Sequence, residues 1–410
     1  MKMDRIDIDF HIHSRYSGAT STSMEIPLIA KCAELKGLHI VGTGDALNIN
    51  WLRHIKKNLN ESESGIYSVE GYKTEFIITT EVEDIKRVHH LMLFPSISSA
   101  EDFRDRIHKY SKDIDRDGRP HLRLNGEQIA DYAKDVNALI GPSHAFTPWT
   151  AIYKGYDSLS ECYGNNLRHI KFLELGLSAD TYMADRISEL QDITFMSNSD
   201  AHSPQPHRLG REFNRILLKE ITYRDIVNAI EYRNGRKFVL NVGLNPREGK
   251  YHLTACTKCY VRFKLQDAIR LRWKCPECGG RIKKGVIDRI NELATWEKPH
   301  HPGHRPKYMH SIPLAEVISL STGITTPTSA KIKERWDRLV DIFGTEINIL
   351  IDSEISEIRK IDPEVGRIIE TFRFSRIRYV AGGGGQYGRP TLKNEEDNFW
   401  GTGQKLLNEF

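Results

Sequence analysis

Residues 5–13 read RIDIDFHIH, in which polar and apolar side chains alternate. Alternation with a period of two is typical of a β-strand that has two different faces. His11 and His13 therefore project from the same face of the strand, about 7 Å apart. Two imidazoles at this spacing can bracket a metal ion, although packing histidines in a core would give the same pattern.

The segments after this strand alternate between strand-like and helix-like patterns as far as residue 234. Asp or His side chains recur at the ends of the strand-like segments, for example at Asp45, His144 and Asp200. In β/α barrels the chemistry lies at the carboxyl ends of the strands. The pattern therefore favours a site with several metal ions over a chance scatter of histidines.

Several short motifs in this half resemble those of the PHP superfamily (polymerase and histidinol phosphatase). They are DFHIH at 9–13, Thr80-Glu81, PSH at 142–144 and DAH at 200–202. The resemblance implies an α/β fold, a distorted seven-stranded β/α barrel that hydrolyses phosphate esters with two to three divalent metals. The implied metal ligands are His11, His13, Asp45, Glu81, His90, His144, Asp200 and His202. The implied catalytic residues are His11, His13, Glu81, His144, Asp200 and His202.

Two positions in this ligand set differ from the family pattern or required a choice. Residues 44–46 read GDA, so the histidine of the family's T-D-H motif is missing at Ala46. His90 is preferred to the neighbouring His89, because HLML at 90–93 is more similar to the family strand. Imidazole and carboxylate ligands suit Zn²⁺, Mn²⁺ or Fe²⁺, with Mg²⁺ as a further candidate. The bridging position falls to Glu81, and a carboxylate there would hold two ions about 3.5–4 Å apart.

Four cysteines form two C-x2-C pairs separated by fifteen residues, Cys256 with Cys259 and Cys275 with Cys278. Two such turns complete a tetrahedral thiolate site, so we expect structural Zn²⁺. Disulfides are the weaker alternative, because we expect a cytoplasmic protein. Residues 256–284 carry nine basic and two acidic side chains, with aromatic residues between them. Basic and flat side chains together suit nucleic acid, although a small ribbon could use them for packing and solubility.

Charge separates the chain into an acidic and a basic part. The net charge is +4, yet residues 236–410 contain 30 basic and 21 acidic side chains. The basic part also contains the run GGGGQYGRP at 382–390, whose glycines permit close backbone approach to a ligand. A flexible linker is the alternative for this run. A Pro- and His-rich stretch at 298–306 favours an ordered surface connection over a second metal site.

These observations predict three domains and a DNA-directed activity. The expected domains are a barrel at 1–240, a four-cysteine zinc ribbon at 241–285 and a mainly helical DNA-binding domain at 286–410. Barrel, ribbon and the Gly-rich run together resemble the endonuclease Q family. The DNA-binding residues that we expect are Lys258, Arg262, Lys264, Arg270, Arg272, Lys274, Arg376, Arg378, Gly382, Gly383, Gly384, Gly385, Tyr387 and Arg389.

The resemblance to endonuclease Q implies a DNA repair enzyme. Its expected substrate is double-stranded DNA with a uracil, hypoxanthine, xanthine or abasic lesion. The expected cut lies on the 5′ side of the lesion and leaves a 3′-hydroxyl and a 5′-phosphate. The alternatives are a phosphatase of small phosphate monoesters and a non-catalytic nucleic-acid-binding protein. No run of about 18 apolar residues is present, so we expect no membrane association. The sequence predicts no particular protein partner.

Overall fold

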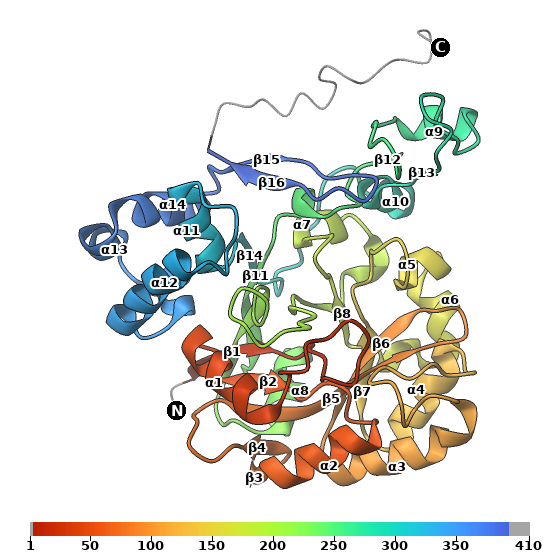
Figure 1. Ribbon diagram of the computed structural model, residues 1–410. Helices are drawn as coiled ribbons and strands as arrows, with labels where there is room; N and C mark the ends of the chain where they lie inside the picture. Colours follow the sequence, from red (N-terminus) through yellow and green to blue (C-terminus); the bar gives the residue numbers. More distant parts are fainter. Residues whose placement is uncertain (1–2, 393–410) are drawn as a thin grey trace.

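The computed structural model describes residues 3–392, and Figure 1 shows three parts. A barrel with its helices forms the lower half, a small ribbon lies at the top, and a helical domain lies at one side. Among the described residues no helix is long and apolar enough to cross a membrane. Residues 393–410, which the predicted C-terminal domain includes, lie outside the described part.

Seven strands surround the barrel interior. They are β1 (Asp4–Asp9), β2 (Ile40–Gly42), β5 (Glu75–Glu83), β6 (His89–Phe94), β7 (Leu139–Pro142), β8 (Phe172–Glu174) and β9 (Thr194–Met196). β1, β2 and β5 are parallel neighbours, β6 is antiparallel to both β5 and β7, and β8 pairs with β9. A bridge between Ile12 and Ala201 joins the chain after β1 to the chain after β9. The predicted α/β fold with a distorted barrel is confirmed.

The reversed direction of β6 matters for the site. The carboxyl ends of β1, β2 and β5 lie at one mouth of the barrel, and the beginning of β6 lies at the same mouth because the strand is antiparallel to β5. His89 therefore reaches that mouth from the first residue of a strand rather than from its end. Apolar residues from the two faces of the strands form two buried clusters, a larger one that includes Ile78 and Met92 and a smaller one that includes Ile77 and Leu91.

The sheet continues beyond the barrel on both sides. The additional strands are β3 (Asn60–Glu63), β4 (Ile66–Ser68), β10 (Phe213–Leu218), β11 (Lys237–Gly243) and β14 (Lys307–His310). β14 pairs in parallel with β11, and Val286 and Ile290 lie in the larger buried cluster. α10 (Val286–Leu293) and β14 therefore pack against the barrel, and the predicted domain bounds stay a prediction.

Helices cover the outside of the barrel. They are α1 (Ile26–Lys36), α2 (Ile49–Asn58), α3 (Ile97–Ile107), η1 (His108–Tyr110), α4 (Gly126–Asp135), α5 (Ile152–Gly155), α6 (Leu159–Tyr163), η2 (Gly164–His169), α7 (Thr181–Ala184), η3 (Ser188–Leu190), α8 (Tyr223–Ile230), η4 (Pro246–Glu248) and α10 (Val286–Leu293). α1 ends at Gly37, whose φ of 100° is a left-handed conformation that favours glycine. This ending turns the chain directly into β2.

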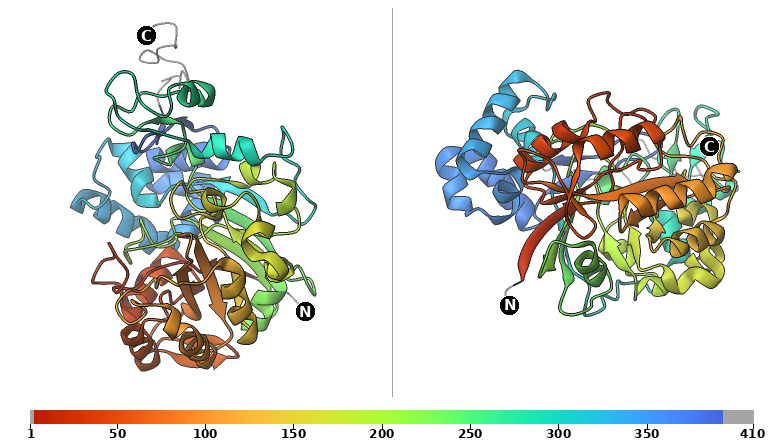
Figure 2. Two further views of the ribbon diagram at one scale, coloured as in Figure 1. Left: turned by 90° about the vertical axis from the view of Figure 1, so that its right-hand side faces the viewer. Right: turned by 90° about the horizontal axis from the view of Figure 1, so that it is seen from below.

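The ribbon consists of β12 (Ala255–Cys256), α9 (Leu265–Arg270) and β13 (Ile282–Lys283). The C-terminal helices are α11 (Leu314–Thr322), α12 (Ala330–Phe343), η5 (Asn348–Asp352), α13 (Ile355–Ile361) and α14 (Pro363–Arg373). They enclose a core of their own and lie beside α1 in both views of Figure 2. The hairpin β15 (Arg378–Val380) and β16 (Arg389–Thr391) then leads back toward the ribbon (Figure 1).

Ion pairs, one of them fully buried, join the helical domain to the barrel. Lys36 at the end of α1 lies with its Nζ 2.6 Å from Glu346 Oε1, and both side chains are almost fully buried. Arg215 of β10 connects Asp7 of β1 with Asp352 of η5 at 2.8 and 2.6 Å. Because these contacts join elements from both parts, the helical domain has a defined position on the barrel.

The Pro- and His-rich stretch is an ordered connection, as predicted. His301 Nδ1 lies 2.6 Å from Oδ2 of the buried Asp185, and Arg305 makes an ion pair with the same carboxylate. The His300 ring stacks on Trp296 with a centroid distance of 4.3 Å. These contacts attach the stretch to the barrel through separate partners and do not form a shared metal site.

Candidate metal centre

Six side chains at the mouth of the barrel form two adjoining groups of metal-ligand type. The groups are His11, His13 and Asp200, and Glu81, His89 and His144. In the second group, Glu81 Oε1, His89 Nδ1 and His144 Nε2 lie 3.1 Å from one another. Ligands of a tetrahedral Zn²⁺ with bonds of about 2.0–2.1 Å lie about 3.3 Å apart, which is close to this spacing.

Glu81 lies between the two groups. Its Oε1 is 3.5 Å from His11 Nε2, and its Oε2 is 3.5 Å from His13 Nε2. Asp200 Oδ1 lies 3.2 Å from the same His13 nitrogen. A carboxylate in this position can bridge two ions, which is the role that the resemblance implies for Glu81.

Further carboxylates orient the imidazoles. His11 Nδ1 lies 2.8 Å from Glu174 Oε2, and His13 Nδ1 lies 3.0 Å from Asp45 Oδ1. An ionised carboxylate only accepts hydrogen bonds, so each Nδ1 donates and each Nε2 keeps a lone pair for a metal ion. Glu174 was missed in the sequence, although its place at the end of β8 follows the same rule of strand ends as the other site residues.

The orphaned atoms test whether metal ions fit this site. His11 Nε2, His13 Nε2, Glu81 Oε1 and Asp200 Oδ1 are buried and have no hydrogen-bond partner. Such atoms carry a desolvation penalty of about 1–3 kcal/mol each, and more when charged. Bound cations would supply the partners that these converging atoms lack. The residues therefore fit divalent metal ions.

The electrostatics lead to the same conclusion. Burial by itself lowers the pKa of His11, but the charges of Glu174 and Glu81 outweigh it and raise that pKa well above its ordinary value. Burial likewise opposes the charged form of His13, and Asp45 and Asp200 raise its pKa well above the ordinary value. The cluster thus has an excess of negative charge, which divalent cations can neutralise.

Asp45, His144 and Asp200 have positive φ angles of 48°, 28° and 48°. This conformation is uncommon for residues other than glycine and is strained. All three residues stand just after β2, β7 or β9, where the strand ends and the chain turns at the mouth. The strained backbone at these three positions turns their side chains toward the cluster.

The mouth of the cluster is formed by three side chains with partial exposure. Arg119 Nη1 lies 3.1 Å from Glu81 Oε2, and the Arg119 side chain is 27% exposed. His202 and Asp200 are 32% and 29% exposed, while His11, His13 and Glu81 are at most 1% exposed. These three residues are therefore the part of the cluster that solvent reaches. Arg119 comes from the loop before α4 and carried no recognisable sequence signal.

The structure brings His89, and not the predicted His90, to Glu81 and His144. His89 is opposite Glu83 in the strand register and faces Glu81, whereas His90 is opposite Val82 and lies, fully buried, with Asp84 and Cys162 in a separate group of metal-ligand type. His90 Nδ1 lies 2.7 Å from the Tyr163 hydroxyl. Adjacent residues of a strand point to opposite faces, so only one of the two can reach the cluster.

Asp45 is also placed differently from the predicted metal ligand. Its carboxylate accepts hydrogen bonds from the Ser14 backbone N–H and hydroxyl and from the Ser17 hydroxyl, in addition to the contact with His13. Burial by itself raises the pKa of Asp45, but His13 and Ser14 outweigh it and hold the pKa below its ordinary value. With its oxygens engaged in this way, Asp45 positions His13 instead of facing the metal space.

The four cysteines of the ribbon converge as predicted. Cys256 Sγ lies 3.5 Å from Cys278 Sγ, and Cys259 Sγ lies 3.6 Å from Cys275 Sγ. A tetrahedral site with Zn–S bonds of about 2.3 Å requires sulfurs about 3.8 Å apart, whereas a disulfide requires about 2.0 Å. The sulfur geometry fits a metal ion and excludes disulfide bonds between these pairs.

The Gly-rich run is a packed turn rather than an open cradle. The N–H groups of Gly382, Gly383 and Gly385 donate to Arg247, Gln386 and Lys250 carbonyl oxygens at 2.8, 3.0 and 2.8 Å. A Cβ on Gly384 would lie 2.2 Å from the Cys256 carbonyl oxygen. Three of the four N–H groups are therefore engaged within the chain, and a role of Gly382–Gly385 in binding DNA stays a prediction.

The predicted DNA-binding side chains lie on different parts of the structure. Lys258, Arg262, Lys264, Arg270, Arg272 and Lys274 belong to the ribbon, and Arg376, Arg378, Tyr387 and Arg389 lie on or beside β15 and β16. Arg262 Nη2 donates to the Ala381 carbonyl oxygen at 2.7 Å. This contact brings the ribbon and the β15–β16 hairpin together, and the role of these residues in binding DNA stays a prediction.

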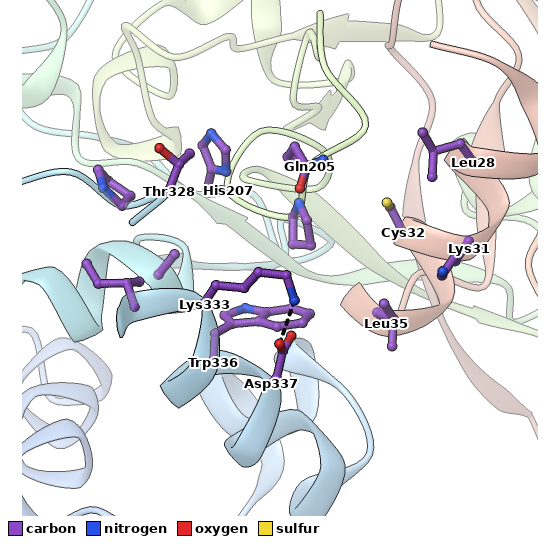
Figure 3. A pocket seen from close by; sticks show the side chains of 14 residues that line it. Leu28, Lys31, Cys32, Leu35, Gln205, His207, Thr328, Lys333, Trp336 and Asp337 are labelled. Atoms are coloured by element: carbon purple, nitrogen blue, oxygen red, sulfur yellow. Dashed lines mark hydrogen bonds and ion pairs between the residues drawn. The ribbon is translucent and has the colours of Figure 1, made fainter. Parts of the chain in front are cut away.

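A separate cavity of about 600 Å³ lies between α1 and α12 (Figure 3). Leu28, Cys32 and Leu35 face it from α1, and Trp336 and Lys333 face it from α12. None of the predicted metal ligands lines this cavity. Its place is the seam between the barrel and the helical domain, and the metal centre lies elsewhere.

Known proteins are similar to this chain, some over one part of it and others over nearly its full length. Residues 313–376 match a family described as the MJ0043 C-terminal domain. The uncharacterized protein MJ0043 of Methanocaldococcus jannaschii is 48% identical over 258 residues, 62% of this chain and 32% of that protein. The chain thus spans about a third of MJ0043. The uncharacterized protein YqxK of Bacillus subtilis is 29% identical over 94% of this chain and 99% of its own length.

Two solved structures are similar over nearly the full length. One is the lesion-specific endonuclease PfuEndoQ from Pyrococcus furiosus, with a TM-score of 0.90 and 49% identity over 96% of each chain. The other is endonuclease Q in complex with a 27-mer duplex that has an abasic lesion at the active site. It has a TM-score of 0.90 and 49% identity, and the match covers 96% of this chain and 98% of that one.

Proposed function

The chain belongs to the endonuclease Q family, and from this premise we propose that it is a metal-dependent endonuclease that hydrolyses a phosphodiester bond of duplex DNA at a lesion. The observation that carries the proposal is the convergence of four buried, unpartnered ligand atoms at the mouth of the barrel. The complex of a 49% identical relative with an abasic duplex supports the choice of substrate.

The side chains around the cluster have distinct tasks in this reaction. His11, His13, Glu81, His89, His144 and Asp200 would hold the metal ions. Divalent ions in such a site activate water and neutralise charge that develops on the phosphate. Glu174 and Asp45 hold His11 and His13 with the proton on Nδ1, which keeps each Nε2 directed at the ions.

The partly exposed side chains at the mouth face the substrate. The guanidinium of Arg119 can bind a non-bridging phosphate oxygen, since Arg forms charge-assisted hydrogen bonds with phosphate. His202 Nδ1 lies 2.9 Å from the Asp200 carbonyl oxygen, so its proton is held on Nδ1 and Nε2 remains to accept a metal ion or a proton. Both residues therefore position the scissile phosphate over the cluster.

We further propose that the enzyme accepts deaminated bases as well as abasic sites and cuts on their 5′ side. Deamination of adenine or cytosine gives a carbonyl acceptor beside a ring N–H donor, so one pocket can accept hypoxanthine and uracil and reject their parent bases. The damaged nucleotide would leave the base stack, which costs less when the base is mispaired. The products would be a 3′-hydroxyl and a 5′-phosphate.

End-labelled duplexes test this function. Duplexes with one uracil, hypoxanthine or abasic site are incubated with Mn²⁺, Mg²⁺ or Zn²⁺, and we expect a single nick beside the lesion and none in undamaged DNA. Asp200→Asn should lower the rate at least 100-fold and keep salt-sensitive binding to DNA. Asp337→Asn on the surface of α12 is the control and should keep full activity. Absence of nicking in wild-type protein with every metal would contradict the proposal.

A further inference from the structure

An exposed group of rings and lysines lies beside the metal centre. The aromatic–lysine patch consists of Trp149, Tyr251, Tyr387, Lys250 and Lys283. Trp149 and Tyr387 are 48% and 71% exposed. The Trp149 and Tyr251 rings meet edge to face at 5.8 Å, and Lys283 Nζ lies 3.8 Å above the Trp149 ring. Lys250 Nζ lies 5.6 and 5.5 Å from the Tyr251 and Tyr387 rings.

The chain connects this patch directly to the metal centre. Trp149 follows the candidate ligand His144 by five residues, and the loop between them closes on the other candidate ligand. The carbonyl oxygen of Thr150 accepts a hydrogen bond from the His89 N–H at 2.9 Å. In the middle of the loop, Lys283 Nζ donates to the Pro148 carbonyl oxygen at 3.0 Å. The position of Trp149 is therefore fixed relative to both histidines.

Four distant segments build the patch. Trp149 comes from the loop after β7, Lys283 lies in β13, Tyr251 and Lys250 precede β12, and Tyr387 lies within the Gly-rich run. The Gly385 N–H donates to the Lys250 carbonyl oxygen at 2.8 Å, which holds the last two segments together. In Figure 1 the β15–β16 hairpin lies next to β12 and α10, in agreement with these contacts. The tight turn of the Gly-rich run thus places Tyr387 in the patch.

The chemistry of the patch identifies what it binds. Exposed flat rings accept nucleobases by stacking, independently of sequence, and lysines beside them contact the flanking phosphates. A cavity of about 350 Å³ adjoins the loop, and its charged lining residues are Lys154, Lys283, Lys284, Arg289 and Asp157. Lys284 and Arg289 make ion pairs with Glu292 and Asp157, so Lys250 and Lys283, which lie beside the rings, are the lysines that we assign to phosphate contacts.

We propose that the aromatic–lysine patch receives a base that the lesion leaves unstacked, on the strand held at the metal centre, with Trp149 as the main stacking surface. This inference rests on the proposed function and adds to it a group that positions the substrate. Stacking on Trp149 holds the distorted strand so that the phosphate next to the lesion lies over the cluster. Undamaged DNA presents no free base and gains nothing from the patch.

Fluorescence of 2-aminopurine tests the proposal without turnover. The probe is a duplex with 2-aminopurine next to a stable abasic analogue, bound to protein that carries Asp200→Asn. With Trp149 present, stacking should quench the probe in the complex. Adding Trp149→Ala should restore fluorescence and weaken binding of the lesion duplex about 10-fold relative to undamaged duplex. Trp149→Phe retains a ring and should retain most of the quenching.

Phe374→Ala is the matched control, because this ring is 59% exposed and lies under Arg376 at 5.0 Å, but stands after α14. It should leave quenching unchanged. Equal quenching in the protein with and without Trp149→Ala, with normal zinc content, would overturn the inference. Nicking by the wild-type protein is measured separately. If the wild type nicks lesion DNA and Trp149→Ala leaves the quenching unchanged, the patch proposal fails and the proposed function stands. If binding of a protein rather than DNA depends on Trp149, the proposal is likewise refuted.

Discussion

The buried ion pair between Lys36 and Glu346 should hold the helical domain on the barrel. The Lys36 Nζ donates to Glu346 Oε1 at 2.6 Å and to the Pro206 carbonyl oxygen at 2.8 Å. Glu346 also accepts hydrogen bonds from the Leu314 N–H at 3.0 Å and from Trp336 Nε1 at 2.6 Å. The carboxylate thus joins α1 of the barrel to α11 and α12 of the helical domain.

Lys36→Met should destabilise the docked domain by about 3 kcal/mol. Removal of one partner of a buried ion pair costs about 3–5 kcal/mol, because an uncompensated charge stays buried. The value belongs at the lower end, since two N–H groups still hold the Glu346 carboxylate. Adding Glu346→Gln removes the unpaired charge, so the double variant should recover a large part of the loss. The coupling free energy expected from the cycle is about 2 kcal/mol.

Hydrogen exchange measured by mass spectrometry gives the local stability, since unfolding of a chain with several parts need not be two-state. Amides of α11 and α12 should exchange about 100-fold faster in Lys36→Met. Lys333→Met removes an exposed ion pair with Asp337 on the same face (Figure 3) and should change exchange less than about threefold. A loss below about 1 kcal/mol in Lys36→Met, or additivity of the two single changes, would refute the reasoning.

Three further predictions concern the metal sites and the pH dependence. His89→Asn should lower the barrel metal content and nicking at least 10-fold, whereas His90→Asn should affect mainly thermal stability; elemental analysis after gel filtration decides between them. Cys275→Ser should release the ribbon zinc and reduce DNA affinity while the barrel metals stay bound, as metal analysis and fluorescence anisotropy would show. Burial raises the pKa of Glu248 to about 8, so this carboxyl is neutral in the folded protein and ionised in the unfolded chain between about pH 4.5 and 8. The wild type should therefore lose stability relative to Glu248→Gln as pH rises through this window, by up to a few kcal/mol. The same difference in melting temperature between the two proteins at pH 6 and at pH 8.5 would contradict this.

Local spacing determined much of the site in advance. Alternation in residues 5–13 places His11 and His13 on one face, and two residues between paired cysteines suffice for a tight metal-binding turn. These features depend on neighbours along the chain, whose geometry the backbone fixes. For the same reason, the recurrence of Asp and His at strand ends predicted which segments contribute to the metal centre.

Strand pairing and long-range contacts decided the rest. Alternation shows that His89 and His90 face opposite ways, but only the register of β6 against β5 selects His89. The same holds for Glu174, which meets His11 across 163 positions of the chain, and for Arg119, which meets Glu81 from a loop. Side-chain partners of this kind arise when separate strands and loops close around one mouth. The sequence therefore specified the ligand chemistry, and the closing of the barrel determined which side chains supply it.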